Sequence, residues 1–359
     1  MGTQDYDAFV KTRYWPQLDG LRVISIAVVL IAHMGDYWVP TFKGALGVII
    51  FFVISGFLIT SLLIREEMRT GRVSIGRFYV RRIFRIVPLY ALALAVATAL
   101  VLVGGFGDPS AHFLTRLPLL ATFNGDLAGG GTFVHSWSIG VEEKFYILWP
   151  LIAFAFLPLR RLRVWIASVL FVVCLILAFV PAFSYFGVYV GILAGCLLSI
   201  ALHDQRAYAV LMKLATPWVG ACLLLLAVLA FLSDIFMPWT DSTGFAHPIF
   251  AITVACAFPA ILLGSGTVTR FLSRKWIAFV GTRAYGIYLF HPFVIDVVDR
   301  VVPAGQTSAG PGLVRLVVAS VLSFVLAELL YRTIEGPLIR VGRRITKSSA
   351  VPETVESTK

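Results

Sequence analysis

The sequence predicts an all-α, polytopic membrane protein with about ten transmembrane helices. Hydrophobic residues make up 59% of the 359 residues and charged residues only 14%, whereas soluble domains are roughly 45–50% apolar and about one quarter charged. Apolar runs long enough to cross a bilayer, or to end among its headgroups, follow one another along the chain. They cover residues 20–36, 44–64, 88–103, 144–157, 164–180, 186–202, 218–236, 246–263, 282–298 and 312–331.

Basic residues predict how these helices are oriented in the membrane. The chain has a net charge of +11, from 30 Lys and Arg against 19 Asp and Glu. Of the 30 basic residues, 23 precede the first run, follow the last, or lie in the connections after the second, fourth, sixth and eighth runs, and the other connections hold few. Because membrane proteins keep Lys and Arg in cytoplasmic loops, both termini are expected to be cytoplasmic. The charge is therefore a topology signal and does not indicate nucleic-acid binding.

The chain shows no pattern typical of a second domain or of a metal site. Its longest connections, residues 65–87 and 104–143, lack the length and hydrophobic pattern of an independent core. We therefore expect one transmembrane domain over residues 1–345 and a short, polar, disordered cytoplasmic tail over 346–359. The four cysteines lie in apolar runs without metal-ligand spacing, so they indicate core packing and no metal.

The first run carries a basic residue near each of its ends. Arg22 and His33 are eleven positions apart, which in an α-helix is about 20° more than three turns and about 16 Å along the axis. They therefore share one helix face at two depths. His33 suits general-base chemistry on a hydroxyl, and the alternative is a structural histidine bonded to a backbone carbonyl. Arg22 could hold an anionic ligand or simply extend to the headgroups.

The second run contains a pair of small residues, and an arginine-rich segment precedes the third run. Ser55 and Gly56 in the second run indicate close helix packing. Before the third run, the segment RFYVRRIFRIVPLY is expected to form an amphipathic helix at the cytoplasmic interface. Arg82 and Arg85 share a face of that helix and could bind a phosphorylated ligand, while attraction to anionic lipid is the alternative.

The fourth run opens with two adjacent carboxylates, Glu142 and Glu143, in the sequence SWSIGVEEKFYILWP. An acid is costly to bring towards hydrocarbon, so its presence there indicates a function. In a first helical turn the two would also complement the helix dipole, with Ser138 as the N-cap. Neighbouring helical residues point about 100° apart, so we expect only one of the two glutamates to face a shared cavity.

The ninth run places Tyr288 and His291 on one helix face, just before Pro292. Because this run is expected to pass outward, both lie in the outer half of the membrane, at the depth expected for His33 and Glu142. Polar groups from three helices at one depth favour a shared site, and an interfacial aromatic belt is the alternative. The remaining histidines lie in loops or at helix ends without metal-ligand spacing.

The chain resembles the acyltransferase-3 family in five ordered blocks, LDGLRVISIAVVLIAH, GVIIFFVISGFLIT, RFYVRRIFRIVPLY, SWSIGVEEKFYILWP and YGIYLFHPFV. The resemblance covers about residues 14–340 and includes YRTIEGP near the C-terminus. The family consists of ten-helix membrane enzymes that take an acyl group, usually acetyl, from cytoplasmic coenzyme A. They pass it to a sugar hydroxyl, often in lipopolysaccharide, exopolysaccharide or a glycosylated small molecule.

The resemblance also implies roles for individual residues. Arg22 and His33 match the family's essential Arg–His pair, and one of the two adjacent glutamates matches its acidic residue. Arg82 and Arg85 match the cytoplasmic R-x-x-R motif implicated in coenzyme A binding. Some members carry an extracytoplasmic domain after the last helix, and the short tail expected here implies a mechanism that does not need that domain in the same chain.

We therefore expect a multi-pass O-acyltransferase of the bacterial cytoplasmic (inner) membrane that uses acetyl-CoA or another acyl-CoA. Its acceptor would be a carbohydrate or glycolipid contacted by His291, Tyr288 and Trp137. His33 would act as general base in a direct transfer and Glu142 would orient it, with a covalent acyl-histidine relay as the alternative mechanism. The alternative functions are a transporter of a small anion or polysaccharide precursor, with buried His and Glu as a proton relay, and a membrane scaffold.

Overall fold

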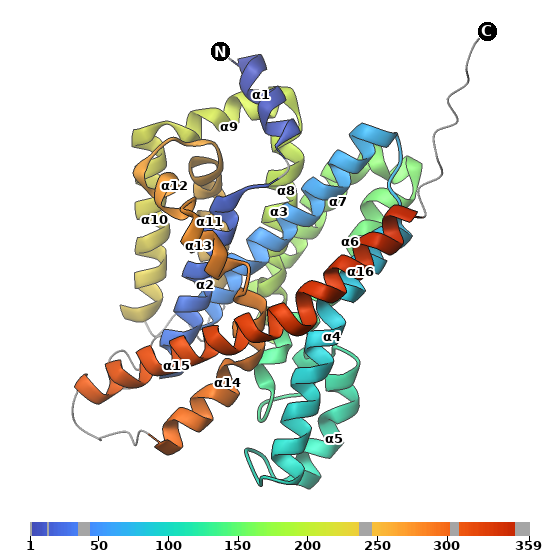
Figure 1. The fold of residues 1–359 in the computed structure, drawn as a ribbon. Coiled ribbons are helices and arrows are strands. Elements are labelled where there is room, and N and C mark those ends of the chain that lie inside the picture. The colour runs from blue at the N-terminus through green and yellow to red at the C-terminus, as the bar shows by residue number, and fades with distance from the viewer. Residues whose placement is uncertain (1, 13, 35–43, 237–245, 302–308, 349–359) are drawn as a thin grey trace.

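The computed structural model describes residues 2–12, 14–34, 44–236, 246–301 and 309–348. Within these ranges the chain is built of helices and contains no strand (Figure 1). Each predicted apolar run coincides with a helix, which confirms the all-α fold class. The N-terminal half contains α1 (Gly2–Lys11), α2 (Pro16–Met34), α3 (Ala45–Thr70), α4 (Ile75–Leu102), α5 (Ser110–Ala121), the 3-10 turns η1 (Gly125–Leu127) and η2 (Val134–Ser136), α6 (Trp137–Pro150) and a π-helical turn, η3 (Leu151–Ala155).

The C-terminal half continues the same pattern of apolar helices and short turns. It ends in a long helical stretch that is interrupted by a second π-helical turn, η7 (Tyr331–Glu335). The elements before and after this turn are α7 (Leu157–Ala178), η4 (Pro181–Phe186), α8 (Gly187–Leu202), α9 (Gln205–Leu211), η5 (Met212–Ala215), α10 (Pro217–Phe236), α11 (Ala246–Leu263), α12 (Thr267–Leu272), α13 (Lys275–Gly281), α14 (Ala284–Val301), α15 (Ala309–Leu330) and α16 (Gly336–Ser348).

Six of the described helices are long and apolar enough to cross a membrane, and a seventh span results if the pair Gln205–Ala215 and Pro217–Leu232, bent by 79°, is counted as one. The helices α6, α11 and α14 occupy the remaining predicted positions. They are shorter or, like α14 with Asp296, Asp299 and Arg300, more charged. The multi-pass membrane architecture is confirmed, and the count of ten spans stays a prediction.

The two ends of the described chain lie towards the same side of the helix bundle. In Figure 1, α1 is at one end of the molecule and α5 at the other, and the C-terminal end of α16 lies in the half that contains α1. This arrangement agrees with termini on one side of a membrane, and the cytoplasmic assignment stays a prediction. The helix α16 continues past Thr346 to Ser348. Residues 349–359, which carry most of the predicted disordered tail, lie outside the described residues.

The centre of the bundle depends on a close pairing of α3 with α8. A Cβ atom added at Gly56 would overlap the carbonyl oxygen of Ile192, and one added at Gly195 would overlap that of Val53. In a membrane the hydrophobic effect does not drive helices together, so their association depends on close packing. Small residues such as glycine allow the two backbones to approach in this way. The predicted packing role of Gly56 therefore agrees with the contacts.

The arginine-rich segment and the third apolar run form one helix. An interfacial helix followed by a separate span was expected, but α4 runs from Ile75 to Leu102 with Pro88 inside it. Against its N-terminal part packs α16, where a Cβ atom at Gly342 would lie 2.8 Å from the Cβ of Phe84. This contact places α16 beside the arginines of α4.

The close α3–α8 pairing predicts a position-specific effect of added volume. We expect Gly56→Ala to lower the free energy of unfolding by about 1–3 kcal/mol, because the new methyl group meets backbone. Gly76→Ala is the matched control, since this helical glycine has open space around its Cβ position, and it should be neutral or stabilise by up to about 1 kcal/mol. Unfolding in detergent measures both, and equal stabilities would contradict the pairing.

Candidate functional site

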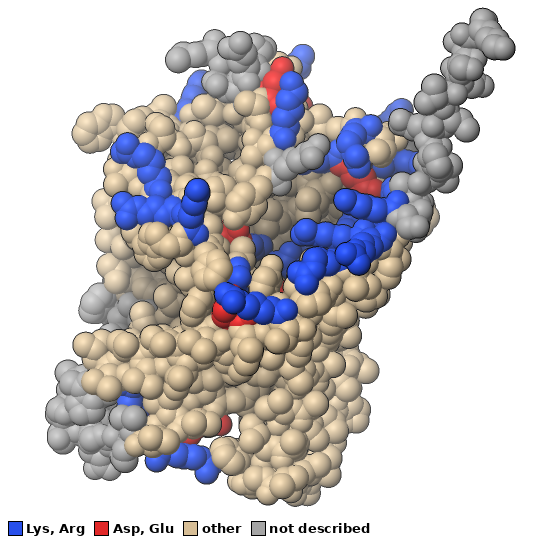
Figure 2. Space-filling model, in the orientation of Figure 1, with Lys and Arg blue, Asp and Glu red and all other residues tan. Residues whose placement is uncertain are grey.

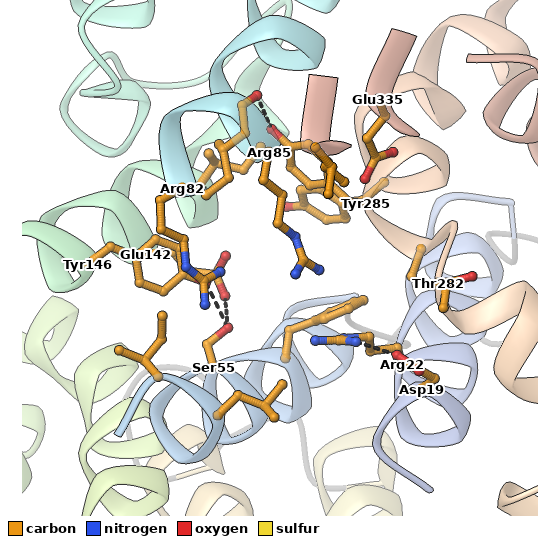
Figure 3. Close-up of a pocket in the computed structure, with 18 of the residues that line it drawn as sticks. Asp19, Arg22, Ser55, Arg82, Arg85, Glu142, Tyr146, Thr282, Tyr285 and Glu335 are labelled. Atoms are coloured by element: carbon orange, nitrogen blue, oxygen red, sulfur yellow. Dashed lines mark hydrogen bonds and ion pairs between the residues drawn. The ribbon is translucent and has the colours of Figure 1, made fainter. Parts of the chain in front are cut away.

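One cavity of about 560 Å³ lies among α2, α3, α4, α6, α14 and the junction of α15 with α16. Figure 2 shows Lys and Arg side chains gathered around a hollow in this region of the surface. Figure 3 shows that Arg22 from α2 and Arg82 and Arg85 from α4 extend into the same space. The charged side chains that line the cavity are Asp19, Arg22, Arg82, Arg85, Glu142, Glu143, Glu335, Arg340 and Arg343.

Arg22 is fixed in the cavity wall by a residue one turn earlier on α2. Its guanidinium forms an ion pair with Asp19, which is only 3% exposed. The hydroxyl of Tyr14 donates a hydrogen bond of 2.7 Å to the other oxygen of the Asp19 carboxylate. A buried carboxylate with two donors holds the arginine in one place, so Arg22 does not simply extend to lipid headgroups.

Glu142 belongs to a directional chain of hydrogen bonds on the cavity wall. Ser55 Oγ donates to Glu142 Oε1 at 2.5 Å and lies 3.0 Å from the hydroxyl of Tyr146. Because a serine hydroxyl has one hydrogen, Tyr146 is the donor in the second contact. The guanidinium of Arg82 lies 4.9 Å from the centre of the Tyr146 ring. Glu142, which was expected to orient His33, is therefore bonded to Ser55, beside the arginines.

Two expectations for the start of α6 were wrong. The helix begins at Trp137 and has no acidic residue in its first turn, so the glutamates do not complement the helix dipole there. Ser138 is not the N-cap, because its hydroxyl lies 2.7 Å from that of Tyr288 inside the bundle. The helix starts earlier than hydropathy suggested because the turn η2 leads directly into it.

Both glutamates line the cavity, which corrects the expectation that only one would. The cavity is wide enough to border two neighbouring positions of α6, although these point about 100° apart. Glu143 Oε1 is buried and has no hydrogen-bond partner among the described residues. It is an unsatisfied acceptor at the edge of the cavity, available to a donor group that enters.

A cluster of three histidines lies beyond this cavity. The ring centre of His291 is 4.9 Å from that of His33 and 5.6 Å from that of His135. Nδ1 of His33 lies 2.8 Å from the carbonyl oxygen of Val29, and Nδ1 of His291 lies 2.7 Å from that of Tyr288. Because a carbonyl only accepts, both Nδ1 atoms carry hydrogen, and the neutral tautomer that this geometry selects has its lone pair on Nε2.

Tyr288 connects the cavity with the histidine cluster. It lines the cavity, and its ring centre is 5.8 Å from those of His135 and His291. Its hydroxyl donates to the carbonyl oxygen of His135 at 2.7 Å and therefore accepts from Ser138. The cavity and the histidines thus share one wall.

The sequence that builds this cavity matches a known protein family. The family model described as an acyltransferase domain matches residues 15–332. The chain belongs to the acyltransferase-3 family. The match runs from the segment before α2 into η7, and the lining residues that lie outside it are Tyr14, Glu335, Gly336, Ile339, Arg340 and Arg343.

Similar proteins are found in bacteria. O-acetyltransferase OatA of Staphylococcus aureus is 29% identical over 376 residues, which cover 95% of this chain and 60% of OatA. YrhL of Bacillus subtilis, named as a candidate peptidoglycan O-acetyltransferase, is 29% identical over 367 residues, 92% of this chain and 56% of YrhL. The acyltransferase-3 chain described here spans about three fifths of the length of these relatives. No solved structure matches it.

The structure separates the expected site residues of this acyltransferase-3 protein into two groups. Arg22, Arg82, Arg85, both glutamates and Tyr288 line the cavity, whereas His33, His291 and Trp137 are not among its lining residues. His33 and His291 lie together, as expected from their depth. Trp137 is half-buried, and its ring packs edge-on against Phe52 at 6.0 Å.

Several members of the site were missed from the sequence. Asp19 could have been found, because it directly precedes the first apolar run and stands one helical turn before Arg22. Ser55 was noticed only as a packing residue. His135 carried no signal, because it precedes α6 in a short turn and meets His291 only through the tertiary fold.

The hydrogen-bond chain on the cavity wall predicts unequal effects of two substitutions. Ser55→Ala removes the donor to Glu142 and should lower the free energy of unfolding by about 1–3 kcal/mol. Tyr146→Phe leaves that bond intact and should cost only about 0.5–1.5 kcal/mol. Chemical unfolding of both single variants and the double variant in detergent measures their coupling. A larger loss for Tyr146→Phe would contradict the assigned direction.

Proposed function

We propose that this protein is a membrane O-acyltransferase that moves an acyl group, preferentially acetyl, from acyl-CoA to a sugar hydroxyl. The observation that carries the proposal is the single wall formed by Tyr288, with an arginine-lined cavity on one side and a histidine cluster on the other. Arginines suit a phosphorylated donor, and a neutral histidine suits a hydroxyl acceptor. Membership of the acyltransferase-3 family and similarity to OatA support the same chemistry.

The donor would bind in the cavity. Arg82 and Arg85 lie near the N-terminal end of α4, which the charge distribution assigns to the cytoplasmic side. Their guanidinium groups and that of Arg22 would hold phosphate groups, while the flexible pantetheine arm reaches along the cavity towards Tyr288. Ser55, hydrogen-bonded to Glu142, would form the polar wall beside that arm.

The acceptor would be a sugar of a polysaccharide such as peptidoglycan, or of a glycolipid, on the opposite side of the bacterial cytoplasmic membrane. His33 is exposed, and its Nε2 lone pair would take the proton of the acceptor hydroxyl. The hydroxyl oxygen then bonds to the thioester carbonyl carbon, the carbon–sulfur bond breaks, and the proton passes to the thiolate of coenzyme A. Tyr288, His291 and Trp137 would border the acceptor.

A first prediction tests the donor side. Arg82→Ala with Arg85→Ala should weaken coenzyme A binding about 10- to 150-fold for each charge-assisted hydrogen bond to phosphate that is removed. Arg69→Ala with Arg72→Ala is the matched control, because these residues have the same spacing but do not line the cavity. Calorimetry on protein in neutral-lipid nanodiscs measures both variants. Equal reductions in affinity would assign the α4 arginines to membrane anchoring.

A second prediction separates His33 from Arg22. His33→Ala should keep the affinity for coenzyme A within a few-fold and reduce acyl transfer about 10²- to 10⁴-fold, the usual contribution of a general base. Arg22→Ala should instead weaken donor binding. The measurement is acceptor-dependent release of free coenzyme A, with donor binding followed separately. Normal transfer by His33→Ala would remove the residue from the mechanism, and a wild-type protein without coenzyme A release would favour the transporter.

A further inference from the structure

The helix α16 carries an arginine pair with the same spacing as the pair on α4. Arg340 and Arg343 stand at i and i+3 in the sequence RVGR, as Arg82 and Arg85 do in RIFR. All four side chains line the same cavity. The α16 pair lies beyond the residues that match the family model. The sequence alone does not distinguish this pair from the other basic residues near the C-terminus.

One face of the α15–α16 junction is directed into the cavity. Its other lining residues, Tyr331, Glu335, Gly336 and Ile339, recur at about one-turn intervals before and beside the pair. Close contact between Gly342 and Phe84 holds α16 against α4. The two arginine pairs therefore come from two packed helices that border one space.

The α16 arginines have no counter-ion in the described part of the protein. Neither Arg340 nor Arg343 forms an ion pair or a side-chain hydrogen bond there, and the same holds for Arg85. By contrast, two neighbouring basic residues do have a carboxylate partner, since Arg283 and Arg332 share Glu328. Guanidinium groups without a counter-ion on a cavity wall favour an anionic ligand, and two arginine pairs favour a ligand with two separate anionic groups.

We propose that Arg340 and Arg343 bind the 3′-phosphate of an acyl-CoA donor, opposite Arg82 and Arg85, which bind its diphosphate. The assignment rests on the proposed function and on the order of groups along the cavity. Arg82 contacts Tyr146, which is bonded to Ser55 beside Glu142, and so lies nearer to the end where the thioester would react. In the donor, the diphosphate follows the pantetheine arm and the 3′-phosphate lies beyond it. A lipid phosphate presents the same chemistry, so the test must separate the two sources.

The experiment compares coenzyme A with 3′-dephospho-coenzyme A on the full-length protein in phosphatidylcholine nanodiscs. The wild type should bind coenzyme A at least about tenfold more tightly than the dephospho form, which corresponds to one charge-assisted hydrogen bond to phosphate. Arg340→Ala with Arg343→Ala should weaken coenzyme A binding by that factor and leave the dephospho form unchanged. Arg344→Ala with Lys347→Ala, which removes two charges of the same helix outside the cavity, should preserve the wild-type preference.

Other outcomes overturn the inference or the proposed function separately. A double variant that keeps the wild-type preference for coenzyme A overturns the inference alone. If the double variant keeps that preference but binds anionic lipid within mixed-lipid nanodiscs more weakly than the wild type does, the pair binds lipid headgroups. A wild-type protein that binds neither nucleotide overturns the proposed function. If the alanine variant does not fold, Arg340→Gln with Arg343→Gln carries the same expectation.

Discussion

The cost of placing charge inside an apolar helix bundle governs how this protein is built. A charged side chain at membrane depth must be paired, hydrogen-bonded or open to water. Arg22 is paired with Asp19, and Glu142 accepts a hydrogen bond from Ser55. Arg85 forms no ion pair or side-chain hydrogen bond among the described residues and faces the cavity, which Glu335 also lines. The cavity is therefore the condition that allows so much charge to remain among apolar helices.

The rigidity of that cavity comes from α3, which has two different faces. Gly56 meets the backbone of α8 so closely that no side chain fits there. The preceding residue, Ser55, points about 100° away and donates to Glu142 on α6. One side of the helix is thus locked by backbone contact while the other presents a fixed hydroxyl. A loosely packed helix would not hold a hydrogen-bond donor at a set position on a cavity wall.

The sequence was sufficient for the fold class, and it identified as candidates those residues whose chemistry conflicts with their surroundings. Arg22, His33 and Glu142 are polar groups in apolar runs, and such a conflict is visible without a structure. Contacts between distant segments were not visible. His135 is an ordinary loop residue until the fold brings it to His291, and Arg340 and Arg343 are concealed among other basic residues until α16 packs on α4. Boundaries failed for a related reason: α6 begins at Trp137, earlier than its hydropathy suggests.

The division of the site at Tyr288 restricts how its two halves can communicate. The tyrosine hydroxyl is held on both sides, as a donor to the carbonyl oxygen of His135 and as an acceptor from Ser138. Moving the ring aside would break both bonds and leave buried polar groups unsatisfied, which costs more than either bond contributes when made. His291, which is 0% exposed, closes the space behind the ring. In the proposed transfer, a reacting group would therefore have to pass beside Tyr288, which lies between the arginine-lined cavity and the histidine cluster that contains His33.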